Sequence, residues 1–427
     1  MSTIYLAPAF LTVYFMRMGG GKESRALLLA LAPAFILGLS AYLYLPVRAS
    51  AGPLMNWGNP VDADAILRHL SGKQYSVWIF SSAETAARQL SYFFRTLGAE
   101  FSYAPIALSL GGMWFLYRRN RDLFVLIALL FAGCLVFAVN YDISDIDSYF
   151  LLAHVATALA ASAGMYAVLT VLAGRRRAVV MGLAGLFLGW QAARTWPSAD
   201  QSDLRVVDQY ARSILGAAEP GGIVISYQWD YFVSASYYLQ VVEGVRPDVV
   251  VVDKELIRLS WYIGYLRQRY PSLLGGLEME TEEYLLELHK FEEGLPYDPR
   301  TIEFRYTALI AGMIARHYPS RAVYVTPEIE ARYTQGYSRI PHGLSLRLRK
   351  EGDGDLWRYV PVVLDSRARE DRYTDAITML AARAELGQAL YLERRGLVTE
   401  ALSAAGRSLA IRPDYAEAQS LLRRLGR

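Results

Sequence analysis

The sequence predicts a polytopic α-helical membrane domain, followed by a small α/β domain and a C-terminal helical hairpin. Of the 427 residues, 53% are hydrophobic and only 20% are charged, which is too apolar for an ordinary soluble protein of this length. The apolar residues concentrate in segments before Trp196-Pro197, and the composition is mixed after that point. We therefore assign residues 1–196 to a transmembrane domain, 197–370 to a soluble α/β domain and 371–427 to a helical segment.

Six apolar segments lie in the first part of the chain. They are Ile4–Met16, Ala26–Pro46, Tyr103–Tyr117, Leu123–Val139, Ser148–Ala173 and Ala178–Ala193. A membrane span needs about 20 apolar residues, so the second and fifth segments pass easily and the first is too short alone. The first segment lacks the basic start and small-residue cleavage site of a signal peptide. We interpret it as the tail of a helix whose start is missing, or as a re-entrant piece.

Basic residues predict the orientation of these segments. They cluster in three short connections, as Arg17, Lys22 and Arg25, as Arg118, Arg119 and Arg121, and as Arg175, Arg176 and Arg177. The positive-inside rule places these connections in the cytoplasm. Two outer loops, 47–102 and 140–147, and everything after Arg194 then lie on the opposite side. The net charge of +3 gives no reason to expect a nucleic-acid partner.

The first outer loop carries polar groups suited to a charged, partly apolar ligand. Gly52-Pro53 and Asn59-Pro60 favour turns, and a helical pattern runs from Asp62 to Gly72. Cationic side chains suit a phosphate and side-chain amides suit sugar hydroxyls. The candidate binding residues are Arg48, Asn56, Trp57, Asn59, His69, Lys73, Gln74 and Tyr75. The alternative is interfacial anchoring, with aromatic rings at the membrane surface and Arg48 and Lys73 reaching lipid phosphates.

An amphipathic helix follows this loop. Ser81 and Glu84 form a capping-box pattern, and apolar residues from Ala83 to Leu97 repeat every three or four positions. Arg88, Gln89 and Arg95 take other faces. Such a helix is expected to lie flat at the membrane interface.

The second outer loop contains three carboxylates at the start of a membrane helix, namely Asp142, Asp145 and Asp147. Helix capping and dipole complementarity explain one or two of them, most naturally Asp147 or Asp145. The remaining acid is then a candidate for one of three roles, which are an ion-pair partner of Arg48, a general base or a ligand of a cation. His154, one turn into the helix, is expected to be buried and hydrogen-bonded.

The soluble part alternates short apolar runs with helical patterns, which predicts an α/β unit. The expected strands are Ile223–Ser226, Val249–Val252 and Ala322–Thr326. Asp230 is interpreted as a helix cap, with a site role as the alternative. No dinucleotide-binding glycine motif follows a strand, and no His-Glu-x-x-His or paired cysteine occurs, so neither a nucleotide cofactor nor a metal site is predicted.

The C-terminal residues follow the order of a tetratricopeptide repeat, with Gly387, Gly396 and Pro413 among the marker positions. The first helix departs from the usual spacing by two extra residues between Gly387 and Gly396. One and a half repeats cannot build a solenoid, which needs about three. This segment is expected to pack on the α/β unit or to bind a partner helix.

Several motifs in series resemble a known family. They are Tyr42-Leu43-Tyr44-Leu45-Pro46-Val47-Arg48, Asn56-Trp57-Gly58-Asn59-Pro60, Gly72-Lys73-Gln74-Tyr75, Tyr141-x-Ile143-x-Asp145-x-x-x-Tyr149-Phe150 and Glu243-Gly244-x-Arg246-Pro247-Asp248. Together they are similar to the bacterial relatives of the protein O-mannosyltransferase-type membrane family, in which an appended tetratricopeptide repeat also occurs. The resemblance covers most of the chain in patches.

The resemblance implies the C-terminal part of a GT-C-type fold in a bacterial cytoplasmic membrane. It also implies sugar transfer from a polyprenyl-phosphate donor to a protein or glycan acceptor on the extracytoplasmic face, without a cofactor. A carboxylate would take the acceptor proton and cations would stabilise the departing phosphate. Tyr149 joins the expected substrate-binding residues. The family's catalytic carboxylate lies in an earlier loop, so the chain is expected to be N-terminally incomplete, and Asp142, Asp145 and Asp147 are the candidate acids within it.

Two other function classes remain open at this point. One is a non-catalytic membrane scaffold, whose α/β and tetratricopeptide-like segments bind envelope partners. The other is a transporter of lipid-linked sugars or polymers. A transporter needs polar groups within its spans, and these spans have almost none besides His154. The transferase is therefore the leading hypothesis.

Overall fold

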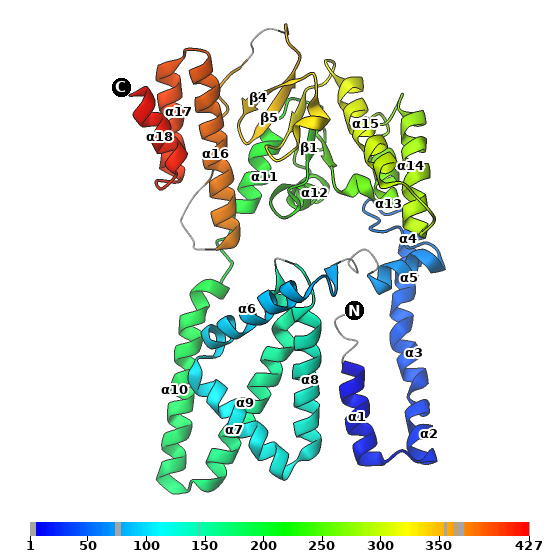
Figure 1. The fold of residues 1–427 in the computed structure, drawn as a ribbon, viewed down its shortest axis with the longest axis vertical. Helices are drawn as coiled ribbons and strands as arrows, with labels where there is room; N and C mark the ends of the chain where they lie inside the picture. Colours follow the sequence, from blue (N-terminus) through cyan, green and yellow to red (C-terminus); the bar gives the residue numbers. More distant parts are fainter. Residues whose placement is uncertain are drawn as a thin grey trace. The chain divides into compact units, whose positions relative to one another are not determined.

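The structure is a computed structural model that describes residues 6–72, 78–143, 145–353, 357–362, 364 and 371–426. It divides into two compact units (Figure 1). The membrane unit contains residues 1–53 and 59–195, and the α/β unit contains residues 54–58 and 196–427. A short segment near the N-terminus thus belongs with the C-terminal half of the chain.

The described residues of all six predicted apolar segments form helices in the membrane unit. The helices are α1 (Leu6–Met18), α2 (Lys22–Ala30), α3 (Ala32–Ser40), η1 (Ala41–Leu43), α4 (Tyr44–Ser50), α5 (Ala63–Ser71), α6 (Ala83–Phe101), α7 (Tyr103–Arg119), α8 (Arg121–Val139), η3 (Ile146–Phe150), α9 (Leu151–Val171) and α10 (Gly174–Ala199). Within the described residues, three helical stretches are long and apolar enough to cross a membrane, namely Lys22–Ser50, Arg121–Val139 and Ile146–Val171.

Small residues bring α7 and α9 into close contact. A Cβ atom added at Gly112 would lie 1.8 Å from the Ala160 carbonyl oxygen, and one added at Gly164 would lie 2.0 Å from that of Leu108. Only glycine permits such an approach of two helix backbones, as is common between membrane helices. The helix α8 packs against both members of this pair.

Local capping follows the sequence prediction at α5 and differs at α6. The Asp62 carboxylate accepts a hydrogen bond from the Ala65 amide at 2.7 Å, and Gly72 ends α5 in the left-handed conformation, as predicted. At α6 the predicted cap was wrong by one residue. Ser82 caps the helix by accepting from the Thr85 amide at 3.0 Å, whereas the Ser81 hydroxyl contacts the Thr85 hydroxyl.

The α/β unit is built on a five-stranded sheet with strand order β2-β1-β3-β5-β4. The strands are β1 (Ile223–Ser226), β2 (Val250–Asp253), β3 (Val323–Val325), β4 (Ser338–His342) and β5 (Ser345–Arg349). The first three are parallel and confirm the predicted strands, while β5 pairs antiparallel with β3 and β4. The β4–β5 hairpin was not predicted from the sequence.

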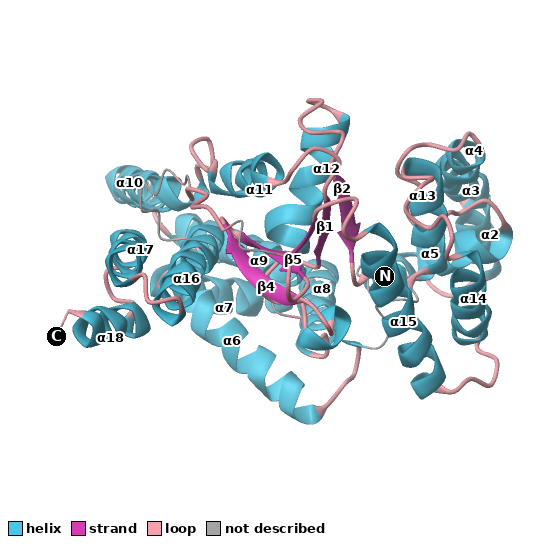
Figure 2. Cartoon of the chain, turned by 90° about the horizontal axis from the view of Figure 1, so that it is seen from above, coloured by secondary structure: helices cyan, strands magenta, loops and turns pink. Residues whose placement is uncertain are grey.

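Helices cover both faces of this sheet (Figure 2). Along β1, Ile223 and Ile225 face one core and Val224 faces the other, which is the period-two alternation of a strand. The first core is shared with α13 (Ser260–Arg269), α14 (Glu278–Glu293) and α15 (Pro299–His317). The second is shared with α11 (Val206–Ala217), η4 (Trp229–Val233) and α12 (Ser234–Val241).

The C-terminal helices extend the second layer. They are α16 (Arg372–Arg394), α17 (Val398–Ile411) and α18 (Ala416–Leu425). Ile377 and Ala381 of α16 join the core of the sheet, and Leu386 and Ala389 join a separate core with α17 and α18. One helix therefore serves both cores, and the tetratricopeptide assignment stays a prediction.

Asp230 does not cap a helix, so that interpretation was wrong. It lies in the first turn of the π-helical η4, where no side-chain capping bond forms. Its carboxylate instead lies 3.6 Å from the Arg372 guanidinium at the start of α16. Because both side chains are about half exposed, this ion pair contributes little to stability.

Candidate functional site

A cavity of about 480 Å³ lies between α6 and the loop that joins α8 to η3. Its lining residues are Arg88, Gln89, Tyr92, Arg95, Asp142, Ile143 and Ile146. The four residues from α6 follow helical spacing and therefore share one face. Figure 1 shows α6 crossing α8 rather than running alongside it, which brings this polar face to the loop. The volume is in the range that holds a small ligand.

Backbone and side-chain bonds hold the loop in place. The Phe80 amide donates to the Asn140 carbonyl at 2.7 Å, and the Asp142 amide donates to the Trp78 carbonyl at 2.9 Å. The Gln89 amide nitrogen, which is buried, donates to the Ile143 carbonyl at 3.1 Å. Gln89 is therefore a structural support of the loop rather than a free ligand donor.

The three candidate acids have different environments. The Asp142 carboxylate accepts from the Arg88 guanidinium at 2.6 Å and from the Ser81 hydroxyl at 3.4 Å. The Asp147 carboxylate accepts from the Tyr92 hydroxyl at 2.5 Å. Because of this hydrogen bond, together with partial burial, the pKa of Tyr92 rises to about 12. Asp142 is the one that lines the cavity.

Asp145 and Asp147 do not cap a helix, so the capping interpretation was wrong. Asp145 stands at the start of η3 without a side-chain capping bond, and Phe150 occupies the cap position of α9. Asp145 is exposed, and no hydrogen bond or ion pair of its carboxylate is formed within the described part of the chain. The carboxylate partner proposed for Arg48 is also corrected, because Asp142 pairs with Arg88.

The guanidinium of Arg95 lines the cavity and is not neutralised by a carboxylate among the described residues of the membrane unit. The side chain of Arg95 is exposed, and its Nε atom donates to the Ser91 carbonyl at 3.3 Å. Among the described residues of the membrane unit (6–53, 59–72, 78–143 and 145–195), no carboxylate forms an ion pair with it. A guanidinium with unused donors beside a cavity suits an anionic group such as a phosphate.

The predicted residues of the first loop are divided between the two units. Arg48 on α4 and His69 on α5 are exposed in the membrane unit, and Asn59 there has a positive φ of 42°. Asn56 and Trp57 belong to the segment grouped with the α/β unit. Lys73, Gln74 and Tyr75 lie outside the described residues.

Tyr149 and His154 lie in the aromatic core below the loop. The Tyr149 ring lies 5.0 Å from that of Tyr141, and its carbonyl accepts from the Cys134 thiol at 3.2 Å. The His154 ring stacks on Phe93 at 5.6 Å. Its Nε2 atom is buried and has no hydrogen-bond partner within the described part of the chain, so the predicted hydrogen bond was wrong.

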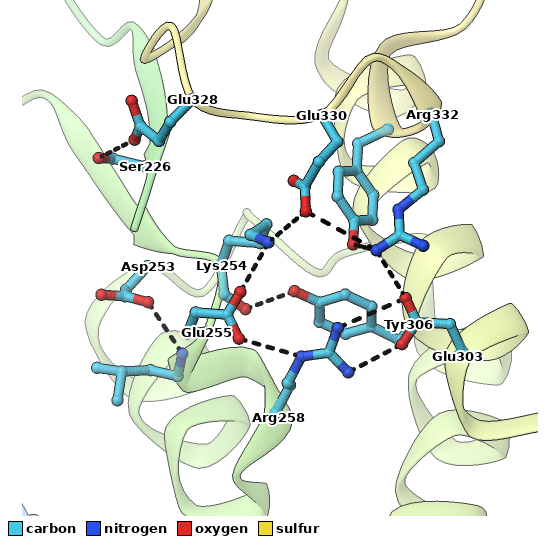
Figure 3. A network of polar contacts seen from close by, with 12 residues as sticks. Ser226, Asp253, Lys254, Glu255, Arg258, Glu303, Tyr306, Glu328, Glu330 and Arg332 are labelled. Atoms are coloured by element: carbon cyan, nitrogen blue, oxygen red, sulfur yellow. Dashed lines mark hydrogen bonds and ion pairs between the residues drawn. The ribbon is translucent and has the colours of Figure 1, made fainter. Parts of the chain in front are cut away.

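The α/β unit has its own charged network at the carboxyl edge of the parallel strands (Figure 3). Lys254, only 3% exposed, contacts Glu255 at 2.7 Å and Glu330 at 3.1 Å. Burial alone would lower the pKa of the Lys254 ammonium, but these two carboxylates outweigh it and the net shift is upward. Arg258 continues the network to Glu255 and to Glu303, at 3.2 and 2.9 Å. Each of these charges has an opposite partner.

Arg246, from the last of the resembling motifs, has a structural role. Its guanidinium donates to the carbonyls of Leu215 and Ala218, at 2.8 and 2.9 Å, and to the Asp248 carboxylate at 2.9 Å. The hydrogen bond from Arg246 lowers the pKa of Asp248 to about 2. Within the described residues, no group of three or more His, Cys, Asp or Glu side chains is arranged to hold a metal ion.

Sequence reasoning missed Tyr92 and the cavity-lining role of Arg88 and Arg95. The available signal was their spacing with Gln89, at helical intervals on one face of a helix that is otherwise amphipathic. That spacing shows a shared polar face, but it does not show which loop the face meets.

Comparison with known proteins shows a distant similarity to a membrane-protein sequence. The chain is similar to "Protein O-mannosyl-transferase TMEM260" of Mus musculus, with 26% identity over 272 residues. The match covers 58% of this chain and 38% of the relative, so the chain spans well under half of the relative's length. No protein-family model and no solved structure matches. The similarity, with the apolar helices, supports a membrane protein of a glycosyltransferase-like family.

Proposed function

We propose that this chain is a membrane glycosyltransferase, or the C-terminal portion of one, which transfers a sugar from a polyprenyl-phosphate donor to an acceptor hydroxyl. The acceptor is a protein or a glycan, and the reaction takes place on the extracytoplasmic face of a bacterial cytoplasmic membrane. The similarity to a protein named as an O-mannosyl-transferase supports the reaction class and does not favour the scaffold alternative. The three basic connections support the orientation.

The observation that carries the proposal is the pairing pattern in the cavity. Asp142 lies beside Arg88 at 2.6 Å, while Arg95, on the same face of α6, has no carboxylate partner among the described residues. A site for a phosphate-linked sugar needs open positive charge for the phosphate and a carboxylate for the acceptor hydroxyl. Both kinds of group line this cavity.

In the proposed reaction, the acceptor oxygen bonds to the anomeric carbon while the bond from that carbon to the phosphate oxygen breaks. The acceptor proton passes to a carboxylate, for which Asp142 is the first candidate and Asp145 and Asp147 are the alternatives. Negative charge grows on the departing lipid phosphate, and Arg95 stabilises it. The other predicted contacts to the donor remain part of the proposal. They are Arg48, Asn56, Trp57, Asn59, His69, Lys73, Gln74 and Tyr75 of the first loop, and Tyr149 of η3.

Purified chain in lipid nanodiscs, supplied with polyprenyl-phosphate sugars and hydroxyl-bearing peptides or glycans, tests the proposal. Loss of a general base lowers the rate by about 100- to 10,000-fold, which is the expected effect of Asp142→Asn. Arg95→Ala is expected to raise the donor KM, with partial rescue in Arg95→Lys because a lysine keeps the charge. Glu84→Gln, at an exposed acid in the first turn of α6, is the matched control.

Two results would contradict this proposal. One is a chain that folds and binds no polyprenyl-phosphate sugar and transfers none. The other is full transfer by the Asp142→Asn, Asp145→Asn and Asp147→Asn variants taken singly, which would remove every candidate acid of this chain from the reaction.

A further inference from the structure

The segment Leu54–Gly58 follows α4 in the sequence, yet it packs within the α/β unit. The Trp57 ring lies between two other indoles, 5.3 Å from Trp229 and 5.0 Å from Trp261. Met55 packs against the same core. We propose that Leu54–Gly58 is an intramolecular anchor, and that Trp229 and Trp261 form the aromatic receptor through which the α/β unit holds this segment.

The receptor lies at the carboxyl edge of the parallel strands, which is the edge of an α/β sheet that ordinarily faces a ligand. Trp229 follows the end of β1, and Trp261 follows the end of β2, its parallel neighbour. Ligands of such sheets bind outside the carboxyl ends of the strands. Here the side chain of Trp57 comes to these two strand ends, so a part of the same chain takes the place of a ligand.

Hydrogen bonds hold the residues on either side of the receptor. Next to Trp229, the Gln228 amide nitrogen donates to the Glu328 carboxylate at 2.8 Å. Next to Trp261, the Tyr262 hydroxyl accepts from the Asp253 amide at 2.9 Å. These bonds fix the two elements that carry the indoles. A preorganised aromatic surface binds with less loss of conformational entropy than a mobile one.

The contacts of the Trp57 ring favour anchoring over the other two roles considered for it. Stacking on a sugar or insertion into a lipid interface each requires ring surface open to the ligand or the lipid. In the structure the ring is half-buried against indoles at tilted and edge-on angles of 46° and 65°. Aromatic pairs in these geometries attract each other beyond the effect of area burial.

The anchor also has a consequence for sugar transfer, and this part rests on the proposed function. Leu54–Gly58 lies between Arg48 and the pair Asn59 and His69, which are predicted to contact the donor. Because Leu54–Gly58 is held in place, the freely moving parts of the first outer loop are shorter. Less conformational entropy is then lost when the donor binds. Trp57 is thus a positioning residue, and releasing it should weaken donor binding more than it slows the chemical step.

Three measurements on the full chain in nanodiscs test the anchor. The first is the circular-dichroism exciton signal of neighbouring indoles. The second is hydrogen exchange of the peptide covering Leu54–Gly58. The third is the donor KM and kcat. Trp57→Ala is expected to abolish the exciton signal of this indole cluster and to speed hydrogen exchange in this peptide. The same substitution should raise the donor KM about tenfold, which corresponds to about 1.4 kcal/mol, with little change in kcat. Trp57→Phe should restore much of the protection and of the KM. Trp196→Phe, at a position 69% exposed, is the matched control.

The exciton signal and the exchange rate test the anchor, and the donor KM tests the positioning role of Trp57. An exciton signal and slow exchange that persist in Trp57→Ala would overturn the anchor itself. A released segment with an unchanged KM would overturn the positioning role. If the wild-type chain shows no transfer at all, the proposed function fails, while the exciton and exchange measurements still decide whether the anchor forms.

Discussion

Asp253, at the end of β2, offers a sharp test of the electrostatics of the α/β unit. Its side chain is buried, and its Oδ1 atom accepts a hydrogen bond from the Leu256 amide at 2.9 Å. Burial penalises the charged form and outweighs this bond, so the pKa of Asp253 rises from 3.8 to about 6. Asp253→Asn removes the charge and keeps an oxygen that can accept from Leu256.

The sign of the effect follows from proton linkage. The native state holds the Asp253 proton more tightly than the unfolded state, so the free energy of unfolding falls as pH rises from about 4 through about 6. A shift of roughly 2 units corresponds to about 3 kcal/mol at most. At pH 7 the wild-type chain carries this whole penalty. We therefore expect Asp253→Asn to be the more stable protein at pH 7, by up to about 3 kcal/mol.

This difference is measured by unfolding the full chain in urea between pH 4 and pH 8. Hydrogen exchange of peptides from β1, β2 and β3 reports the unfolding of the α/β unit. Asp298→Asn is a control of opposite sign, because backbone hydrogen bonding from Arg300 holds the pKa of Asp298 below its ordinary value. Its contribution is present above the unfolded pKa and is lost as pH falls. Equal pH slopes for wild type and Asp253→Asn would show that Asp253 does not carry a raised pKa in the native state.

Three further predictions concern packing and buried charge. Gly112→Ala should separate α7 from α9 and lower the thermal stability of the membrane unit in detergent. Gly111→Ala, where an added Cβ meets nothing within 4 Å, should be tolerated, and equal melting temperatures of the two variants would contradict this prediction. Arg407→Ala removes the ion-pair partner that lies 3.0 Å from Glu385, which is 1% exposed and keeps only the hydrogen bond from the Tyr359 hydroxyl among its described partners. It should lower the free energy of unfolding in urea by on the order of 1–3 kcal/mol, with partial recovery on adding Glu385→Gln. Arg246→Lys cannot reproduce the guanidinium bonds to Leu215, Ala218 and Asp248, so it should destabilise the α/β unit by on the order of 1–3 kcal/mol, and an unchanged urea midpoint would count against this.

Elements with strong local signals could be predicted from the sequence, and the β4–β5 hairpin could not. The three parallel strands are short apolar runs that are buried on both faces, as parallel strands usually are. In β5, Leu346 and Leu348 alternate with arginines, which is a strand pattern. Its partner β4 contains Pro341, which argues against a strand in a sequence reading. β4 is at the sheet edge, where a proline is tolerated.

The candidate acids could be found from the sequence, but their partners could not. Three aspartates before a membrane helix exceed what capping needs, and this excess indicated a site. Which cation meets Asp142 depends on how α6 crosses the loop, because Arg88 is 54 positions away in the chain. Periodicity fixes the face on which Arg88 lies, while the crossing is set by tertiary packing of Phe93 and Leu97 against the core below the loop.

The two charged clusters of this chain differ in what they leave available to a ligand. In the α/β unit, the ammonium of Lys254 and the guanidinium of Arg258 are each paired with two carboxylates of their own network, so an added anion would have to displace existing partners. In the membrane unit, Arg88 is paired with Asp142 whereas Arg95 faces the cavity without a carboxylate partner among the described residues. An anion can therefore bind at Arg95 without breaking an ion pair. We therefore propose the cavity at α6 as the ligand site, whereas the paired charges at the sheet edge contribute to the fold.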